Sequence, residues 1–200
     1  MDVMETAALR ARVSRDEALG AFQRGWFGAT ARMLVAGPLR SVAEAFVPFR
    51  LFRVVMADGD GMRQRLLAID AVEGSLDLYG FDSAPTEAEL VRVVSRNILP
   101  VVVSVERCAE LVEDRVRRMV YRRGFFRARG VRNVVEYTGM EFCVPYWLGF
   151  CGRGGRARVV VMDAVRGRVE GGKARELFRK WLVDGEERGV EERRDFKFQI

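Results

Sequence analysis

The stretch Val47-Pro48-Phe49-Arg50-Leu51-Phe52 recurs later in the chain as Val144-Pro145-Tyr146-Trp147-Leu148-Gly149. Each copy continues through a Gly-x-Gly, an Arg-x-Arg and an Asp-Ala-Val-x-Gly motif, which end at Gly74 and Gly167. Eleven of the 26 aligned positions in 47–54 and 59–76 are identical to their counterparts, where average composition gives about two. The sequence therefore predicts an internal repeat.

Each copy has the pattern of a β-hairpin. An aromatic-rich strand follows the Val-Pro pair, and the Gly-x-Gly motif supplies a turn in which glycine accepts positive φ. The return strand alternates polar and apolar residues, as in Arg156-Ala157-Arg158-Val159. Asp70 and Asp163 end the return strands, and an aspartate there can accept hydrogen bonds from nearby backbone amides. This reading of the aspartates competes with a symmetric acid–base pair.

Helical patterns lie before, between and after the hairpins. Ser14 and Glu17 form a capping box, as do Thr86 and Glu89, and Ser104 can cap a helix with a continuous apolar face. The predicted helices cover residues 14–33, 86–99, 104–120 and 174–182.

This layout predicts an α+β fold of two repeat-related helix–β-hairpin modules, with antiparallel strands and covering helices. The predicted division is a first module at 1–82, a linker helix at 83–103, a second module with the C-terminal helix at 104–183, and a flexible tail at 184–200.

The composition excludes several classes of mechanism. The 200 residues include no histidine, so catalysis by Ser-His-Asp or Cys-His and metal ligation by imidazole are ruled out. Three cysteines without a Cys-x-x-Cys pair make a zinc or iron–sulfur site unlikely, so we expect no metal and no cofactor. The N-terminus lacks the pattern of a secretory signal and no apolar run is long enough to span a membrane. We expect a cytoplasmic protein with buried, reduced thiols.

The order of capped helix, strand, Gly-x-Gly turn and strand ending in Asp-Ala-x-x-Gly resembles the PepSY domain. The resembling pieces are Ser14 to Ala18 with Ile69 to Gly74, and Met162 to Gly167. The resemblance implies two stretches of about 60 to 70 residues that act as interaction or inhibitory domains without catalysis. The chain departs from that family in lacking a leader and in a long insertion between the first helix and its strand.

Arginine is concentrated in one segment. Residues 115–132 carry eight arginines and no acid, and the rest of the chain sums to −2 because the total charge is +6. Part of this charge is explained by i,i+4 pairs in the predicted helix, and the alternative is a solvated helix end. Arginines interleaved with aromatic residues are also typical of binding to nucleic acid or to an anionic membrane. The candidate anion-binding residues are Arg122, Arg123, Arg127, Arg129 and Arg132.

A second candidate site is the set of aromatic residues on the two repeated strands. They could line a pocket or stack on bases, although filling a core is the competing interpretation. These residues are Phe49, Phe52, Tyr146, Trp147 and Phe150.

The sequence favours a non-catalytic interaction or ligand-binding module whose partner is an unknown protein or small ligand. The alternative is an anion-binding protein that uses segment 115–132, with nucleic acid as the possible partner. Edge strands of the hairpins could also pair between chains and make an oligomer.

Overall fold

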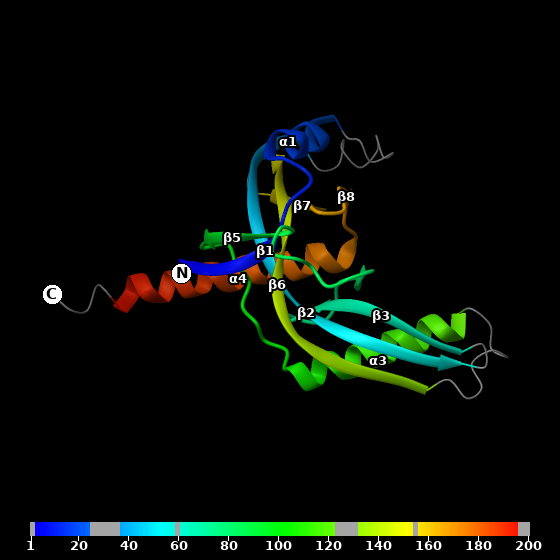
Figure 1. Ribbon diagram of the computed structural model, residues 1–200. Coiled ribbons are helices and arrows are strands. Elements are labelled where there is room, and N and C mark those ends of the chain that lie inside the picture. Colours follow the sequence, from blue (N-terminus) through cyan, green and yellow to red (C-terminus); the bar gives the residue numbers. More distant parts are fainter. Residues whose placement is uncertain (1–2, 25–36, 59–60, 123–131, 154–155, 196–200) are drawn as a thin grey trace.

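The computed structural model describes residues 3–24, 37–58, 61–122, 132–153 and 156–195. These residues form a mixed α+β fold, as predicted, in which long antiparallel strands carry helices on both faces (Figure 1). In chain order, the elements are β1 (Met4–Leu9), α1 (Arg15–Arg24), β2 (Leu39–Asp58), β3 (Gly61–Asp70), β4 (Tyr79–Phe81), β5 (Leu90–Ser95), α3 (Val105–Arg122), β6 (Arg132–Arg153), β7 (Arg156–Asp163), β8 (Arg168–Val169) and α4 (Gly172–Asp195).

The two Val-Pro segments meet at the centre of the sheet. β2 and β6 pair antiparallel over most of their length, with Val47 opposite Val144. β3 pairs with β2 and β7 pairs with β6, so the strand and return strand predicted for each copy form an antiparallel pair. β2 and β6 begin well before the Val-Pro pairs, which the sequence placed at the strand starts. The strand order is β4-β3-β2-β6-β1-β5, and β7 and β8 extend from β6.

The main core lies on one face of this sheet. Alternate residues of β2 and β6, such as Val47 and Val144, point to this face because side chains of a strand alternate. The first half of α4 covers them with Leu177, Phe178 and Trp181, as its predicted apolar stripe requires. The buried residues form a continuous cluster from Leu9 to Trp181, which stabilises the sheet by removing apolar surface from water.

On the opposite face, each helix covers the hairpin that does not follow it in sequence. Phe22 of α1 packs with Trp147 and Met162 of the β6–β7 hairpin. Val112 of α3 packs with Phe52 of the β2–β3 hairpin. The helix of each predicted half of the chain therefore covers strands of the other half. Strands from both sides of the predicted boundary at 82/83 belong to one sheet.

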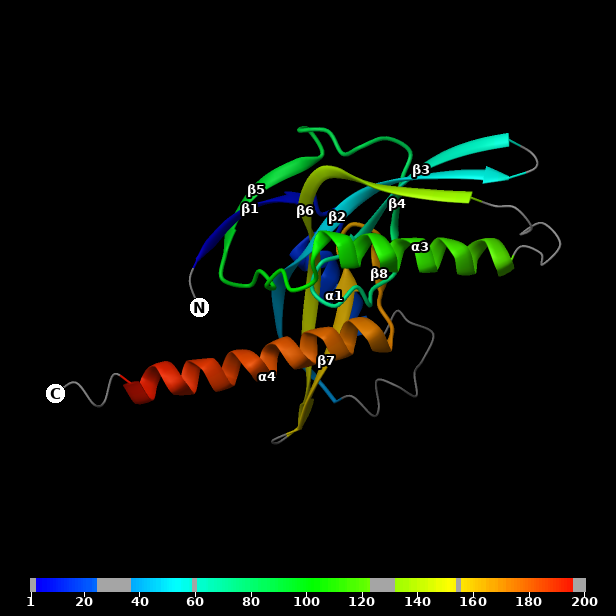
Figure 2. The ribbon, with the colours of Figure 1, turned by 90° about the horizontal axis from the view of Figure 1, so that it is seen from below.

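Part of the sheet continues away from the centre as an arm. We define the arm as 51–58 of β2, 61–68 of β3, 132–140 of β6 and α3, which lies along one face of these strands (Figures 1 and 2). The pairing of β2 with β6 shifts register between Arg50 and Phe52, where the arm begins. The C-terminal end of α3, the start of β6, the end of β2 and the start of β3 share the distal end of the arm (Figure 1).

The predicted linker helix at 83–103 is wrong. The capping box forms, because the backbone amide of Thr86 donates to Glu89 Oε2 at 2.9 Å. The chain then makes only one turn before β5, whose valines Val91 and Val93 alternate with polar or exposed residues and pack inward. Branched side chains with period two favour a strand over a helix, and pairing with β1 supplies the partner.

The predicted tail at 184–200 is corrected in part, because α4 continues to Asp195 (Figure 2). A charged segment can extend a helix whose first turns are fixed by packing, since adding a residue to an existing helix costs little. The first predicted helix is observed over Arg15–Arg24, and its remainder to position 33 lies outside the described residues. The helix predicted from Ser104 is observed as α3, and Ser104 Oγ accepts the amide of Arg107 at 3.2 Å.

Candidate functional site

Asp70 is fully buried and its carboxylate organises the turn after β3. Oδ1 accepts the backbone amides of Glu73 and Gly74 at 2.9 and 2.8 Å, and Oδ2 accepts the amide of Leu76 at 2.8 Å. Gly74 has φ of +64°, which a glycine adopts without strain. Arg115 of α3 donates to the carbonyls of Gly74 and Leu76 and fixes this turn to the helix. The carboxylate is therefore occupied by structural hydrogen bonds.

Asp163 holds the corresponding turn after β7 in a different way. It is also fully buried, and Oδ1 accepts the amides of Val165 and Arg166 at 2.9 and 2.8 Å. Oδ2 accepts the hydroxyl of Tyr79 from β4. Burial, with further contributions from Tyr146 and Asp163, raises the pKa of Tyr79, so the phenol stays protonated and donates.

The guanidinium of Arg166 lies 3.4 Å from the centroid of the Tyr79 ring and its Nη2 donates to the carbonyl of Leu78 at 2.7 Å. Tyr79, which the sequence analysis missed, thus links β4 to the turn after β7. A buried tyrosine beside an aspartate that closes a distant turn leaves no local pattern in the sequence. Asp70 and Asp163 occupy separate turns with separate partners, so the hydrogen bonds support the turn interpretation over a shared proton.

The three cysteines are free and buried, as expected. Burial raises the pKa of Cys143 to about 11. It also raises the pKa of Cys108, although the nearby Arg50 acts in the opposite direction, and the pKa of Cys151. A thiol is a nucleophile only as the thiolate, so these residues are unreactive at neutral pH in the folded protein.

Arg50 is the one buried cation of the described core. Its Nε donates to Glu141 Oε1 at 2.6 Å, and its Nη1 donates to the carbonyl of Val103, just before α3. The hydroxyl of Tyr137 also donates to Glu141, at 3.2 Å. The pair joins β2, β6 and the start of α3 at the base of the arm, so it positions the arm rather than presenting a charge to solvent.

The candidate aromatic residues do not come together as one surface. Phe49, Phe52, Tyr146 and Trp147 are buried, with exposed fractions from 0% to 7%, and Phe150 is half-buried. Phe49 and Tyr146 belong to the main core, whereas Phe52 lies under α3 and Trp147 under α1. Stacking on a base requires an exposed ring face. The predicted stacking platform is therefore corrected to a set of core residues.

The described part of the arm carries exposed arginines on both of its faces. Arg63 and Arg65 of β3 lie on the face along which α3 packs. Side chains two positions apart on a strand point to the same face, and Leu67 and Ile69 of β3 pack against α3. Arg53 lies on the other face and pairs with Glu136 at 3.5 Å. The predicted anion-binding residues fall at the distal end. Arg122 ends α3 and Arg132 begins β6, but the side chains of these two, and all of Arg123, Arg127 and Arg129, lie outside the described part of the chain.

Two charged pairs on α3 match the sequence prediction. Arg117 pairs with Glu113 at 2.7 Å, and Arg118 pairs with Asp114. The described turns of the helix are thus nearly balanced, so the excess positive charge of segment 115–132 belongs to residues 122–132 in the sequence.

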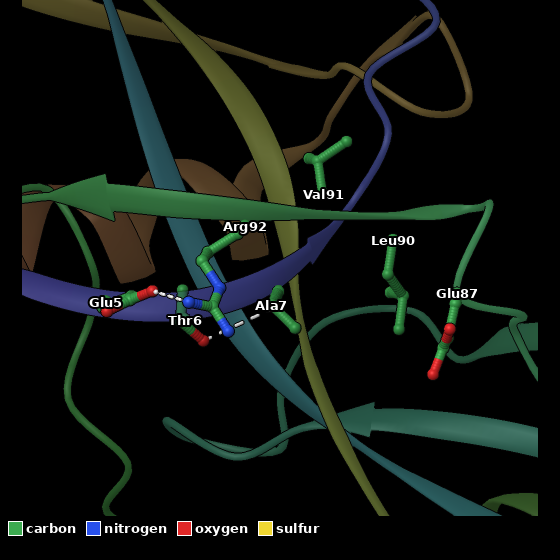
Figure 3. A pocket seen from close by; sticks show the side chains of 7 residues that line it. All are labelled: Glu5, Thr6, Ala7, Glu87, Leu90, Val91 and Arg92. Atoms are coloured by element: carbon green, nitrogen blue, oxygen red, sulfur yellow. Dashed lines mark hydrogen bonds and ion pairs between the residues drawn. The ribbon is translucent and has the colours of Figure 1, made fainter.

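A hollow of about 580 Å³ lies along the ribbon of β1 and β5. Its lining combines the apolar Ala7 and Leu90 with the charged Glu5, Glu87 and Arg92, whereas the side chain of Val91 points to the other side of β5 (Figure 3). Arg92 pairs with Glu5 across the two strands at 3.0 Å. The sequence analysis missed this site, because it depends on a strand that was read as a helix. The residues that line the hollow are Glu5, Thr6, Ala7, Glu87, Leu90, Val91 and Arg92.

Among the described residues, no group of three or more acids and cysteines is placed to hold a metal ion, and no helix is long and apolar enough to cross a membrane. Comparison with family models, with curated proteins and with solved structures found no match to this chain.

Proposed function

We propose that this protein is a non-catalytic interaction module that binds an anionic polymer, with nucleic acid as the ligand, at the distal end of its arm. The observation that supports this proposal is that both ends of stretch 122–132, which holds five arginines, lie there: α3 ends at Arg122, and β6 begins at Arg132 opposite Ala57 of β2. In the sequence, residues 123–131 between these two ends carry three further arginines and no acid.

The charged residues near this end of the arm do not cancel the excess positive charge of residues 122–132. Arg63 and Arg65 add two positive charges at the same end, which Asp58 and Asp60 offset in the sequence. A local excess of arginine binds phosphates through Coulomb attraction and hydrogen bonds, and it does so with little dependence on base sequence. An arm that extends from a stable sheet suits this task because the ligand can approach its end without disturbing the core.

The interior supports a binding role over a catalytic one. Asp70, Asp163 and Arg50 are all engaged in structural hydrogen bonds, and the buried thiols stay protonated. We further propose that the two hairpins are repeat units related by an approximate twofold axis near Val47 and Val144, which pair with each other. A PepSY-like organisation of these units remains part of this proposal.

Fluorescence anisotropy with labelled single-stranded and double-stranded oligonucleotides, across a salt series, tests the function. We expect binding that weakens steeply with salt, because bound phosphates release counterions. A variant with Arg122, Arg123, Arg127 and Arg129 replaced by alanine should lose at least about tenfold in affinity.

The matched control replaces four exposed arginines away from the arm end, and it should keep most of the affinity. These are Arg12, Arg15, Arg158 and Arg175. Equal loss in both variants, or no binding at low salt by a folded protein, would contradict the proposal. Binding to vesicles of anionic lipid without binding to oligonucleotides would assign the arm to a membrane surface instead.

A further inference from the structure

β5 is an edge strand of the described sheet. Among the described strands it pairs only with β1, and it lies at the rim of the molecule (Figure 2). The amide of Arg10 donates to the carbonyl of Glu89, which lies directly opposite in the register. In an antiparallel pair such hydrogen-bonded positions alternate, so Val91, Val93 and Ser95 also direct their backbone groups to β1. Arg92 and Val94 therefore direct theirs outward.

The side chains along β5 favour one kind of partner. The acids Glu87 and Glu89 precede the strand and Arg96 follows it, whereas Arg92 within the strand is already paired with Glu5 of β1. A strand that is acidic at one end and basic at the other is complementary to itself when two copies run antiparallel. Val94 is 65% exposed and would be covered in such a pair.

We propose that β5 pairs antiparallel with β5 of a second copy, which makes a twofold-symmetric dimer with one continuous sheet. The register follows from the outward-facing backbone groups: Arg92 of each copy opposes Val94 of the other, and Val93 lies on the twofold axis. Both positions present outward amides and carbonyls, so the pair exchanges hydrogen bonds in the regular antiparallel pattern.

The hollow beside β5 gives this register a further contact. In the proposed pairing Arg96 of one copy, in the bend directly after β5, comes opposite Leu90 of the other. Leu90 and Glu87 line the hollow, so Arg96 would enter it with its guanidinium near the carboxylate of Glu87 (Figure 3). In the proposed dimer the hollow of each copy thus binds Arg96 of the other. The arm takes no part in this contact, so the dimer is independent of the proposed function.

Sedimentation velocity over a hundredfold range of protein concentration tests the dimer. We expect a monomer–dimer equilibrium for the natural chain and a monomer for Val94→Pro. Proline at position 94 removes an outward amide and leaves the β1 bonds of its neighbours in place. Circular dichroism establishes that the variant is folded.

Charge reversal provides a test that does not alter the backbone. Glu87→Arg and Arg96→Glu should each raise the dissociation constant of the dimer by about tenfold, and the double variant should restore it to within about threefold. Arg175→Glu changes an exposed arginine of α4 and should have no effect.

Cysteine cross-linking tests the register. Residues opposite each other at a non-hydrogen-bonded position have Cα atoms about 4.5 Å apart, which a disulfide can span. Val93→Cys should therefore form a disulfide dimer on mild oxidation, whereas Val91→Cys, on the same face of β5, should not. The natural cysteines are buried and do not compete. A protein that stays monomeric at every concentration would overturn the proposal. A dimer whose dissociation constant is unchanged by Val94→Pro would also overturn it.

Discussion

Phe52 in the β2–β3 hairpin and Gly149 in the β6–β7 hairpin occupy corresponding positions after the two Val-Pro pairs, and they are opposite in size. Phe52 is fully buried under α3. Gly149 leaves room for Phe22 of α1, whose ring atoms lie 3.0 to 3.2 Å from the place where a Cβ of residue 149 would be. The strand supplies the aromatic ring in one hairpin, and the helix supplies it in the other. The two hairpins are therefore packed against their helices by different residues.

Replacing either of the two buried aspartates should have the largest effect on stability. Asp70→Ala removes the acceptor of three backbone amides. We expect it to lower the free energy of unfolding by about 5 kcal/mol, because hydrogen bonds to a charged group contribute about 1.5–3 kcal/mol each. Asp163→Ala removes the acceptor of two amides and the Tyr79 hydroxyl. Its cost should be about 1 kcal/mol smaller, because the tyrosine hydroxyl can turn to another acceptor or to water.

Urea denaturation of the two variants measures this difference. Tyr79→Phe should destabilise the natural protein but not the Asp163→Ala variant, since the hydrogen bond is already absent there. The same substitution should be additive with Asp70→Ala. Additivity in both backgrounds would show that the Tyr79–Asp163 contact does not contribute to stability.

Replacing the glycines that close the two turns should have smaller effects on stability than replacing the aspartates. Gly74 and Gly167 both have positive φ, so alanine is strained at either position. At position 74 the new Cβ would also lie 2.4 Å from Leu111 Cδ1, whereas at position 167 the nearest atom, Val13 Cγ2, is 3.3 Å away. We expect Gly74→Ala to cost about 3 kcal/mol and Gly167→Ala about 1.5 kcal/mol.

Thermal or urea unfolding measures both costs. In a Leu111→Ala background, the cost of Gly74→Ala should fall to that of Gly167→Ala, because only the backbone strain remains. An unchanged cost in that background would place the whole effect in the backbone.

Gly149→Ala tests whether the β6–β7 hairpin requires a glycine at this position to accommodate the Phe22 ring of α1. Its Cβ would press against the Phe22 ring, and overpacking of this kind costs about 2 kcal/mol. Gly80→Ala in β4 is the matched control, because its Cβ would meet Leu67 at an ordinary 3.8 Å. We expect little change there. Phe22→Leu should relieve part of the Gly149→Ala cost, and double-mutant cycles on urea midpoints would measure this coupling.

How far the sequence predicts this protein depends on the range of the interaction. The hairpins, the turn aspartates and the helix after Ser104 follow from short motifs, because their hydrogen bonds join residues a few positions apart. The exchange of α1 and α3 between the hairpins was not predictable, since an apolar stripe does not specify which distant strands it will meet. β5 was misread because one capping turn outweighed the branched residues after it. The hollow beside it depends on the pairing with β1, which leaves no local signal.

Phe46 and Cys143, at the centre of β2 and β6, differ in that only Cys143 can ionise, so of the two only Cys143 makes stability depend on pH. Each directly precedes a Val-Pro pair in the sequence, and both belong to the small core cluster beside β1. Burial raises the pKa of Cys143 from its ordinary 9.0 to about 11. Between these values the unfolded chain releases the thiol proton and the folded protein retains it, so stability is complete below this window and is lost as pH rises through it.

Replacing the thiol isolates this contribution. Cys143→Val removes the ionisable group, so the difference in unfolding free energy between the natural protein and the variant should shift by about 1 kcal/mol in favour of the variant as pH rises to about 10. Urea denaturation at several pH values measures this shift. Tyr79 and Tyr146, whose pKa values burial also raises, are present in both proteins and cancel in the comparison. A difference that stays constant with pH would mean that the Cys143 thiol ionises as readily in the folded protein as in the unfolded chain.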